Sequence, residues 1–107
     1  MFLQELEEKD FEELVVNSKE PVCVKFYATW CGPCRMLSQV MQDITDEKYN
    51  NVKVYEVDVD SAPKLAQMHG VMSIPTMVFY ADGKQVESVI GFRNETELKD
   101  LFDKYTK

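Results

Sequence analysis

Two kinds of hydrophobic pattern alternate along the chain. Short runs rich in β-branched, aromatic and other apolar residues predict strands, and these runs cover residues 21–28, 52–59, 76–80 and 85–90. Segments whose apolar residues recur every three or four positions predict helices, and they cover residues 10–17, 31–44, 61–70 and 94–105. Strands and helices therefore alternate until the last two strands, which follow each other directly.

Residues at the ends of the predicted helices support these boundaries. Asp10, Ser61 and Asn94 are suitable N-cap residues because their side-chain oxygens can accept a hydrogen bond from the first helical turn. An acidic residue follows Asp10 and Asn94 three positions later, as in a capping box. Gly70 can close the third helix. We expect the chain to be helical at its C-terminal end.

The predicted strands should form one mixed sheet. Residues 21–28 are mostly apolar, as a central strand buried on both faces requires. Asp82-Gly83 favours a tight hairpin, so the strands on either side of it should be antiparallel. The alternation before this hairpin predicts an α/β fold with helices on both faces of the sheet. Ligands of such sheets bind beyond the C-terminal ends of strands, and Cys31 lies just past one of them.

Composition excludes several classes of function. The chain has 107 residues, of which 45% are hydrophobic and 29% charged, so we expect one domain over residues 1–107 with its own core. A net charge of −7 argues against nucleic-acid binding. The N-terminal segment lacks the basic and apolar regions of a signal peptide, and no stretch is long enough to span a membrane. We expect a cytoplasmic protein.

The chemically distinctive feature is the pair Cys31 and Cys34 at the start of a predicted helix. The unpaired N–H groups of the first turn favour a thiolate, so Cys31 should ionise readily and act as the nucleophile. Cys34, one turn further along, should resolve the mixed disulfide that Cys31 forms with a target. Gly32 permits the tight turn and Pro33 suits the first helical position. We expect Cys31 to be exposed and Cys34 to be largely buried.

A zinc site and a structural disulfide are weaker interpretations of the cysteine pair. A zinc site normally needs four ligands, and the sequence adds only Cys23, in an apolar strand, and the distant His69. A purely structural disulfide would be unusual in a cytosolic protein and would close only a very short loop. Cys23 is best interpreted as a small buried hydrophobic residue. His69 is best interpreted as an exposed residue at a helix end.

The sequence resembles the thioredoxin family over essentially its whole length. The motifs that carry the resemblance agree in order and spacing, and they are FYATWCGPC at 26–34, DVD at 58–60, IPT at 74–76, Gly83 and Gly91. The resemblance implies the thioredoxin fold, with a mixed central sheet of about five strands flanked on both faces by about four helices. It also implies a protein-disulfide reductase that works through the Cys31–Cys34 couple without a bound cofactor.

The resemblance extends to the surroundings of the cysteines. It implies a cis peptide bond between Ile74 and Pro75, packed against the Cys31 sulfur. It also implies a shallow apolar surface that binds the target polypeptide, formed by Trp30, the Ile74-Pro75 loop and the turn at Gly91. Met72 is a further candidate for this surface.

One departure from the family concerns two charged residues. Thioredoxins usually have a buried aspartate six residues before the first cysteine and a lysine near it on the neighbouring strand. Here these positions hold Lys25 and Glu56, so the signs are exchanged. A charge in a central strand needs a partner. We therefore expect Lys25 and Glu56 to pair on adjacent parallel strands beneath Cys34 and to support its chemistry.

Partners and competing functions also follow from the resemblance. The implied partners of a monomeric protein are an NADPH-dependent thioredoxin reductase and disulfide-containing targets such as ribonucleotide reductase, peroxiredoxins and methionine sulfoxide reductases. An oxidase or isomerase of disulfides is disfavoured by Gly-Pro between the cysteines. A redox-independent binding module or processivity subunit that uses the same surface is the alternative from another class.

Overall fold

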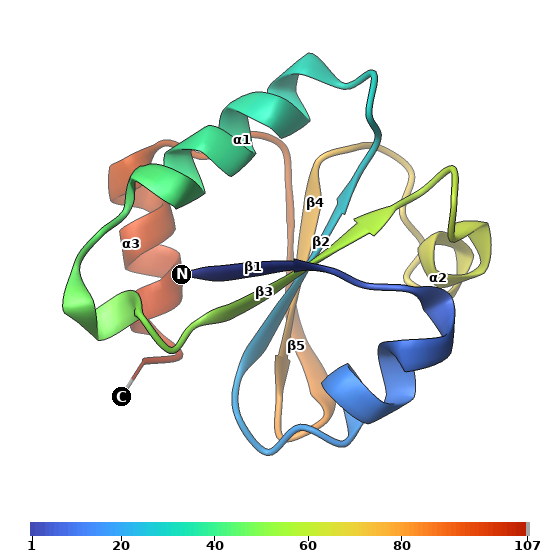
Figure 1. Ribbon diagram of the computed structural model, residues 1–107, viewed down its shortest axis with the longest axis horizontal. Coiled ribbons are helices and arrows are strands. Elements are labelled where there is room, and N and C mark those ends of the chain that lie inside the picture. The colour runs from blue at the N-terminus through green and yellow to red at the C-terminus, as the bar shows by residue number, and fades with distance from the viewer. Residues whose placement is uncertain (107) are drawn as a thin grey trace.

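The computed structural model describes residues 1–106 and is built around a five-stranded mixed sheet with the order β1-β3-β2-β4-β5 (Figure 1). The strands are β1 (Phe2–Glu5), β2 (Val22–Tyr27), β3 (Lys53–Asp58), β4 (Thr76–Ala81) and β5 (Lys84–Ile90). β1, β3 and β2 run parallel, whereas β4 is antiparallel to β2 and to β5. The predicted mixed sheet and terminal hairpin are confirmed.

Helices cover both faces of this sheet, as expected. The α-helices are α1 (Gly32–Asp43), α2 (Pro63–Met68) and α3 (Glu95–Asp103), with shorter helical turns at Glu8–Asp10, Glu12–Val16 and Glu47–Tyr49. α1 and α3 lie on one side of the sheet, and α2 lies on the other with the N-terminal helical segment (Figure 1). Each side encloses its own apolar cluster, so the sheet separates two cores.

β2 is the central strand and its side chains divide between the two cores. Successive side chains of a strand point to opposite faces. Val22, Val24 and Phe26 belong to the cluster beneath α2, and Cys23 belongs to the cluster beneath α1 and α3. Lys25 therefore faces α1, and its side chain is completely buried. The strand positions a cation inside the protein.

β1 is an element that the sequence pattern did not predict. It pairs in parallel with β3, from Phe2 opposite Lys53 to Glu5 opposite Glu56. The strand lies at the edge of the sheet and most of its side chains are exposed. Its backbone pairing, rather than an apolar period, holds it in place, so the hydrophobic pattern of the sequence does not predict it.

The first predicted helix is only partly correct. Asp10 does not cap a helix; it ends a 3₁₀ turn, and the following Glu12–Val16 segment has the wider π-helical hydrogen bonding. Phe11 and Val15 are buried against the sheet. Their packing determines the local geometry in place of the capping signal.

At the next two helix starts, one predicted cap is wrong and the other is correct. Ser61 does not cap α2, because Pro63 occupies the first helical turn and the residue before it, Ala62, becomes the N-cap. Asn94 does cap α3, and its side chain and that of Glu97 form the predicted capping box. The N-cap residue predicts the helix start correctly at Asn94, where no proline lies in the first turn.

Candidate active site

The cysteine pair lies where β2 ends and α1 begins. Cys31 is the N-cap residue of α1 and forms a disulfide with Cys34, their Cα atoms being 5.3 Å apart. The backbone N–H of Cys34 donates a hydrogen bond to the Cys31 sulfur, with a distance of 3.2 Å between nitrogen and sulfur. The helix therefore directs a backbone donor at the sulfur that the sequence predicted as the nucleophile. Such a donor stabilises negative charge on that sulfur once the disulfide is reduced.

The expected exposure of Cys31 is wrong for the disulfide form. Cys31 is 5% exposed and Cys34 is 1% exposed. Ala28 is buried with the pair, and Tyr27, Val59 and Ile74 pack around it. An N-cap position leaves a side chain accessible only if neighbouring loops do not cover it, and here the loops close over the bond. The predicted burial of Cys34 is confirmed.

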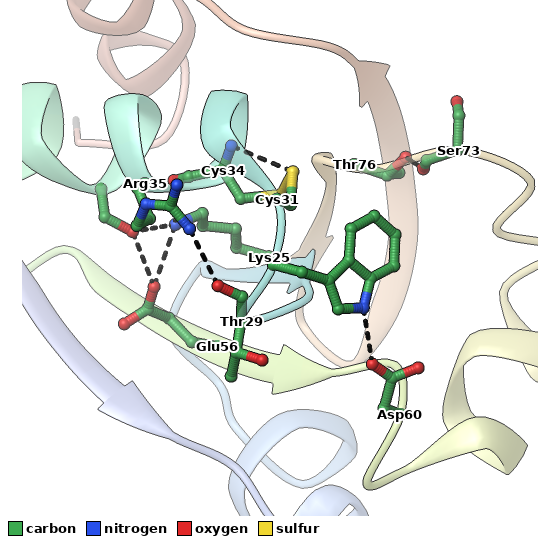
Figure 2. Close-up of a disulfide and its surroundings, with 11 residues drawn as sticks. Lys25, Thr29, Cys31, Cys34, Arg35, Glu56, Asp60, Ser73 and Thr76 are labelled. Atoms are coloured by element: carbon green, nitrogen blue, oxygen red, sulfur yellow. Dashed lines mark hydrogen bonds and ion pairs between the residues drawn. A yellow bond between two sulfur atoms is a disulfide. The ribbon is translucent and has the colours of Figure 1, made fainter.

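The loop before β4 closes one side of the site. The peptide bond between Ile74 and Pro75 is cis, as the resemblance implied. The Pro75 carbonyl accepts a hydrogen bond from the Gly91 N–H at 2.8 Å. The Thr76 hydroxyl donates to the Ser73 carbonyl at 2.7 Å, and Figure 2 shows these last two residues. Gly91 has a φ of 95°, a conformation that favours glycine. These contacts place Gly91 directly beside Pro75.

The side chains predicted for the target-binding surface differ in their exposure and in their contact with the disulfide. Trp30 is 68% exposed, and its indole N–H donates to the Asp60 carboxylate at 2.9 Å, which fixes the orientation of the ring. Ile74 packs against the cysteines, whereas Met72 is 95% exposed and lies outside that packed cluster. Sequence reasoning did not assign Asp60 a role, although it belongs to the DVD motif.

Lys25 and Glu56 form the predicted pair. They are directly opposite each other on β2 and β3, and the Lys25 ammonium lies 3.0 Å from the Glu56 carboxylate (Figure 2). The ammonium also donates to the Cys34 carbonyl at 3.3 Å and to the Ser38 hydroxyl. Ser38 in turn donates to Glu56 at 3.1 Å. The buried cation therefore has three acceptors, one of which belongs to Cys34 itself.

Sequence reasoning missed Ser38, although a signal was available. Ser38 follows Cys34 by four residues in α1, so both lie on the same face of the helix. That face packs on β2 above Lys25. A polar residue at this spacing in an otherwise apolar stripe indicates a partner for the buried charge.

An open depression connects this pair to solvent. It has a volume of about 350 Å³, and its lining includes Cys34, Ser38 and Glu56. The Glu56 side chain is 21% exposed, whereas that of Lys25 is fully enclosed. The carboxylate therefore has access to water on the side of Cys34, and the ammonium has none.

Two further residues, Cys23 and His69, pack against the apolar interior. Cys23 is buried, and burial raises the pKa of its thiol far above the ordinary range, as expected for an unreactive core residue. His69 is not the exposed residue that was expected: its ring packs against Phe11 and Phe26, and its Nε2 lies 2.6 Å from the Tyr80 hydroxyl. These contacts with aromatic side chains account for the partial burial of the His69 ring.

Neither a metal centre nor a membrane span is found in residues 1–106. Within this range no group of three or more His, Cys, Asp or Glu side chains is placed to hold a metal ion. No helix of the same residues has the length and apolar character needed to cross a membrane.

Comparisons of this sequence with known proteins agree with one another. The family model described as Thioredoxin matches residues 2–104. A thioredoxin from Listeria monocytogenes is 40% identical over 103 residues, which cover 96% of this chain and 98% of the relative. Thioredoxin M5, chloroplastic, from Oryza sativa is 39% identical over 99 residues, covering 92% of this chain. This chain spans 58% of the length of that rice relative.

Solved structures agree with the sequence comparisons. A thioredoxin from Malassezia sympodialis superposes with a TM-score of 0.85 at 30% identity, covering 98% of this chain and 91% of the other. A mutant thioredoxin from Halobacterium salinarum NRC-1 gives a TM-score of 0.83 at 38% identity, with 98% and 90% covered. The similarity therefore extends over sequence and fold alike.

Proposed function

The chain belongs to the thioredoxin family, and from that premise we propose that it reduces disulfide bonds in other proteins with its Cys31–Cys34 pair. Thioredoxins are thiol–disulfide oxidoreductases. The observation that carries the proposal is a disulfide at the N-terminus of α1 with a backbone N–H of the first turn aimed at the Cys31 sulfur. This arrangement is the one that nucleophilic thiol chemistry requires.

The reaction has two displacement steps. In the reduced protein, the Cys31 thiolate attacks one sulfur of the target disulfide, which forms a mixed disulfide and releases the other target sulfur as a thiolate. Cys34 then loses its proton and attacks the Cys31 sulfur. The Cys31–Cys34 disulfide forms, and the second target thiolate leaves. The target gains two electrons and, after protonation, two hydrogens, while the protein is oxidised.

The geometry supports the two assigned roles. The Cys34 sulfur sits one helical turn from Cys31 and within bonding reach, so resolution is intramolecular and outcompetes the persistence of the mixed disulfide. Cys31 is the more exposed of the two and receives the backbone hydrogen bond. A target therefore approaches Cys31, and Cys34 resolves.

Lys25 and Glu56 act on Cys34 in this proposal. The ammonium bound to the Cys34 carbonyl favours negative charge on this residue, because an opposite charge nearby stabilises an anion. Glu56 balances the ammonium and faces the open depression on that side of the site. The access of Glu56 to water supports a role for this carboxylate in accepting the Cys34 proton. The pair takes the place of the usual aspartate and lysine with exchanged signs.

The apolar surface around the disulfide serves to bind the target. Trp30, Ile74, Pro75, Gly91 and Met72 contribute to this surface in our proposal. The exposure of Trp30 and Met72 supports it, because large apolar side chains at the surface are typical of interaction sites. The fixed Trp30 ring and the Pro75–Gly91 contact offer a preformed shape.

The oxidised protein needs a source of electrons. Family membership supports recharging by a reductase, for which we propose an NADPH-dependent thioredoxin reductase. The proposed targets are ribonucleotide reductase, peroxiredoxins and methionine sulfoxide reductases, and the proposed location is the cytoplasm. The name of the rice relative places that protein in the chloroplast, so localisation needs a direct test with the tagged chain.

Trapping of the mixed disulfide tests the function. Reduced Cys34→Ser, mixed with insulin as the disulfide target, should form a covalent complex that dithiothreitol releases. Cys31→Ser should form none. The matched control adds Cys23→Ala to Cys34→Ser and should still trap, because Cys23 is a buried residue of the core. Turnover of the unmodified chain with thioredoxin reductase should consume NADPH.

Two results would count against the proposal. Trapping by Cys31→Ser but not by Cys34→Ser would reverse the roles of the cysteines. Tight target binding that persists when both cysteines are serine, without any disulfide reduction by the unmodified chain, would favour the redox-independent binding module.

A further inference from the structure

The two arginines of the chain lie next to two different segments of the proposed target-binding surface. The sequence contains only Arg35 and Arg93, although it contains ten lysines. The Arg35 guanidinium donates to the Thr29 carbonyl at 2.9 Å, in the loop that carries the cysteines (Figure 2). The Arg93 guanidinium lies beside Gly91, where it would be 3.6 Å from a Cβ atom at that residue. The Gly91 N–H is hydrogen-bonded to the Pro75 carbonyl, so Arg93 lies next to the turn that adjoins the Ile74-Pro75 loop.

Both arginines lack a carboxylate partner in the part of the chain that the structure describes. The ion pairs of residues 1–106 involve lysines 9, 25, 48, 53, 99 and 104 and neither arginine. The chain has 19 acidic residues, so carboxylates are abundant. Each guanidinium instead uses one N–H on a backbone carbonyl, that of Thr29 or Phe92, at 2.9 Å. Within residues 1–106 the remaining N–H groups of both guanidinium groups have no side-chain acceptor, so they are available to a ligand.

The carboxylates that border the site do not compete for these groups. Asp60 accepts the hydrogen bond from Trp30, and Glu56 is paired with Lys25. A guanidinium binds a carboxylate through two parallel hydrogen bonds, a geometry that a lysine ammonium cannot reproduce. Two arginines at the margins of the proposed target-binding surface therefore form a recognition element for carboxylates.

We propose that Arg35 and Arg93 select target polypeptides that carry Asp or Glu next to the disulfide to be reduced. The inference rests on the proposed function and specifies its substrates. The apolar surface contacts the target chain around its cysteines, and each guanidinium binds an acidic side chain a few residues away. Arg35 and Arg93 are specificity residues in this scheme, and the sulfur chemistry remains that of Cys31 and Cys34.

The net charge of −7 repels an acidic target. Whether such a target still binds depends on the distance over which each charge acts. At physiological ionic strength, exposed charges separated by more than about 8 Å are largely screened. Carboxylates elsewhere on the surface then act weakly, whereas a guanidinium in contact with a target carboxylate acts fully. Exposed ion pairs of this kind are worth about 2- to 5-fold in affinity for each arginine.

Three disulfide peptides test the inference. They have the same sequence and an intramolecular disulfide, and differ only in carrying Glu, Gln or Lys at the positions flanking the cysteines. The rate constant for oxidation of the reduced protein by each peptide can be followed by the fluorescence of Trp30, the single tryptophan. The unmodified chain should react fastest with the Glu peptide and slowest with the Lys peptide. The preference should shrink at high salt.

The decisive quantity is the ratio of the Glu-peptide rate to the Gln-peptide rate. The ratio cancels any effect of Arg35 on sulfur reactivity, because that effect is common to all peptides. Arg35→Gln and Arg93→Gln should each lower the ratio about 2- to 5-fold. Arg35→Lys and Arg93→Lys should retain part of it. The matched control is Lys19→Gln, which makes the same change in net charge in the loop before β2, at the opposite end of that strand from the cysteines.

The possible outcomes distinguish a failure of this inference from a failure of the proposed function. A ratio of one in the unmodified chain, or an equal fall in the ratio on Lys19→Gln, would refute selection by the two arginines while leaving disulfide reduction intact. Failure to reduce any of the three peptides would refute the proposed function itself.

Discussion

Removing either member of the Lys25–Glu56 pair should destabilise the protein, and by unequal amounts. Glu56→Met leaves an ammonium that is completely buried, and the loss of a partner for such a charge costs about 3 to 5 kcal/mol. Lys25→Met leaves a carboxylate that is 21% exposed beside the open depression, where water can replace the lost partner. We expect this second cost to be smaller, about 1 to 3 kcal/mol.

The double variant Lys25→Met/Glu56→Met should be less destabilised than the sum of the single variants. It leaves no unpaired charge, and apolar replacements of buried pairs are often neutral. The Cys34 carbonyl loses only a second donor, because it lies within α1 and its helical hydrogen bond remains available. Residues in contact couple by about 0.5 to 3 kcal/mol.

Urea unfolding of the oxidised protein, followed by circular dichroism, measures all four free energies. The exposed pair Lys53 and Glu20, 3.7 Å apart, is the matched control and should couple by less than about 1 kcal/mol. In the reduced protein, Lys25→Met should also move thiolate formation at Cys34 to higher pH, which ultraviolet absorbance can follow. Additive stabilities at the buried pair, or a larger loss for Lys25→Met than for Glu56→Met, would refute this reasoning.

Two further predictions concern stability. Gly83→Ala would place a Cβ in steric conflict with the Val16 carbonyl oxygen at a φ of +77°, whereas Gly70→Ala meets nothing within 4 Å at a φ of +63°. Gly70→Ala should therefore cost about 1 to 2 kcal/mol and Gly83→Ala clearly more in urea unfolding, and equal losses would contradict the close approach. The hydrogen bond from Tyr105 and the nearby Lys104 hold the pKa of Glu87 below its usual 4.5, so this carboxylate stabilises the fold above that pH and ceases to do so as the pH falls through the folded-state pKa. Glu87→Gln should flatten the loss of stability between pH 6 and pH 3, and an unchanged profile would exclude the effect.

Elements with strong local signals could be predicted from the sequence. The apolar run of β2 requires burial on both faces, and the Asp82-Gly83 turn has positive φ at both residues, as a tight hairpin demands. The Asn94 capping box formed as expected. In these places the local chain chemistry and the tertiary structure favour the same conformation.

Features that depend on distant contacts could not be predicted in this way. β1 exists because β3 offers it a backbone edge, and its own side chains are mostly exposed. The N-terminal helical segment departs from an α-helix because Phe11 and Val15 pack on the sheet. The burial of Cys31 depends on loops that are remote in sequence, such as the one containing Ile74.

The cluster of Lys25, Glu56 and Ser38 beneath Cys34 could be predicted from the sequence only in part. A lysine in the centre of a buried strand already implies a partner, and the parallel register of β2 and β3 determines that Glu56 provides it. The third member depends on how α1 lies across the strands, since Ser38 reaches both charges only because it shares a helical face with Cys34. Exchanging the signs preserves this geometry because a strand pair can hold a cation and a carboxylate in either order. In this protein it is the ammonium that contacts Cys34, so we expect the exchange to affect the chemistry of Cys34 and not the fold.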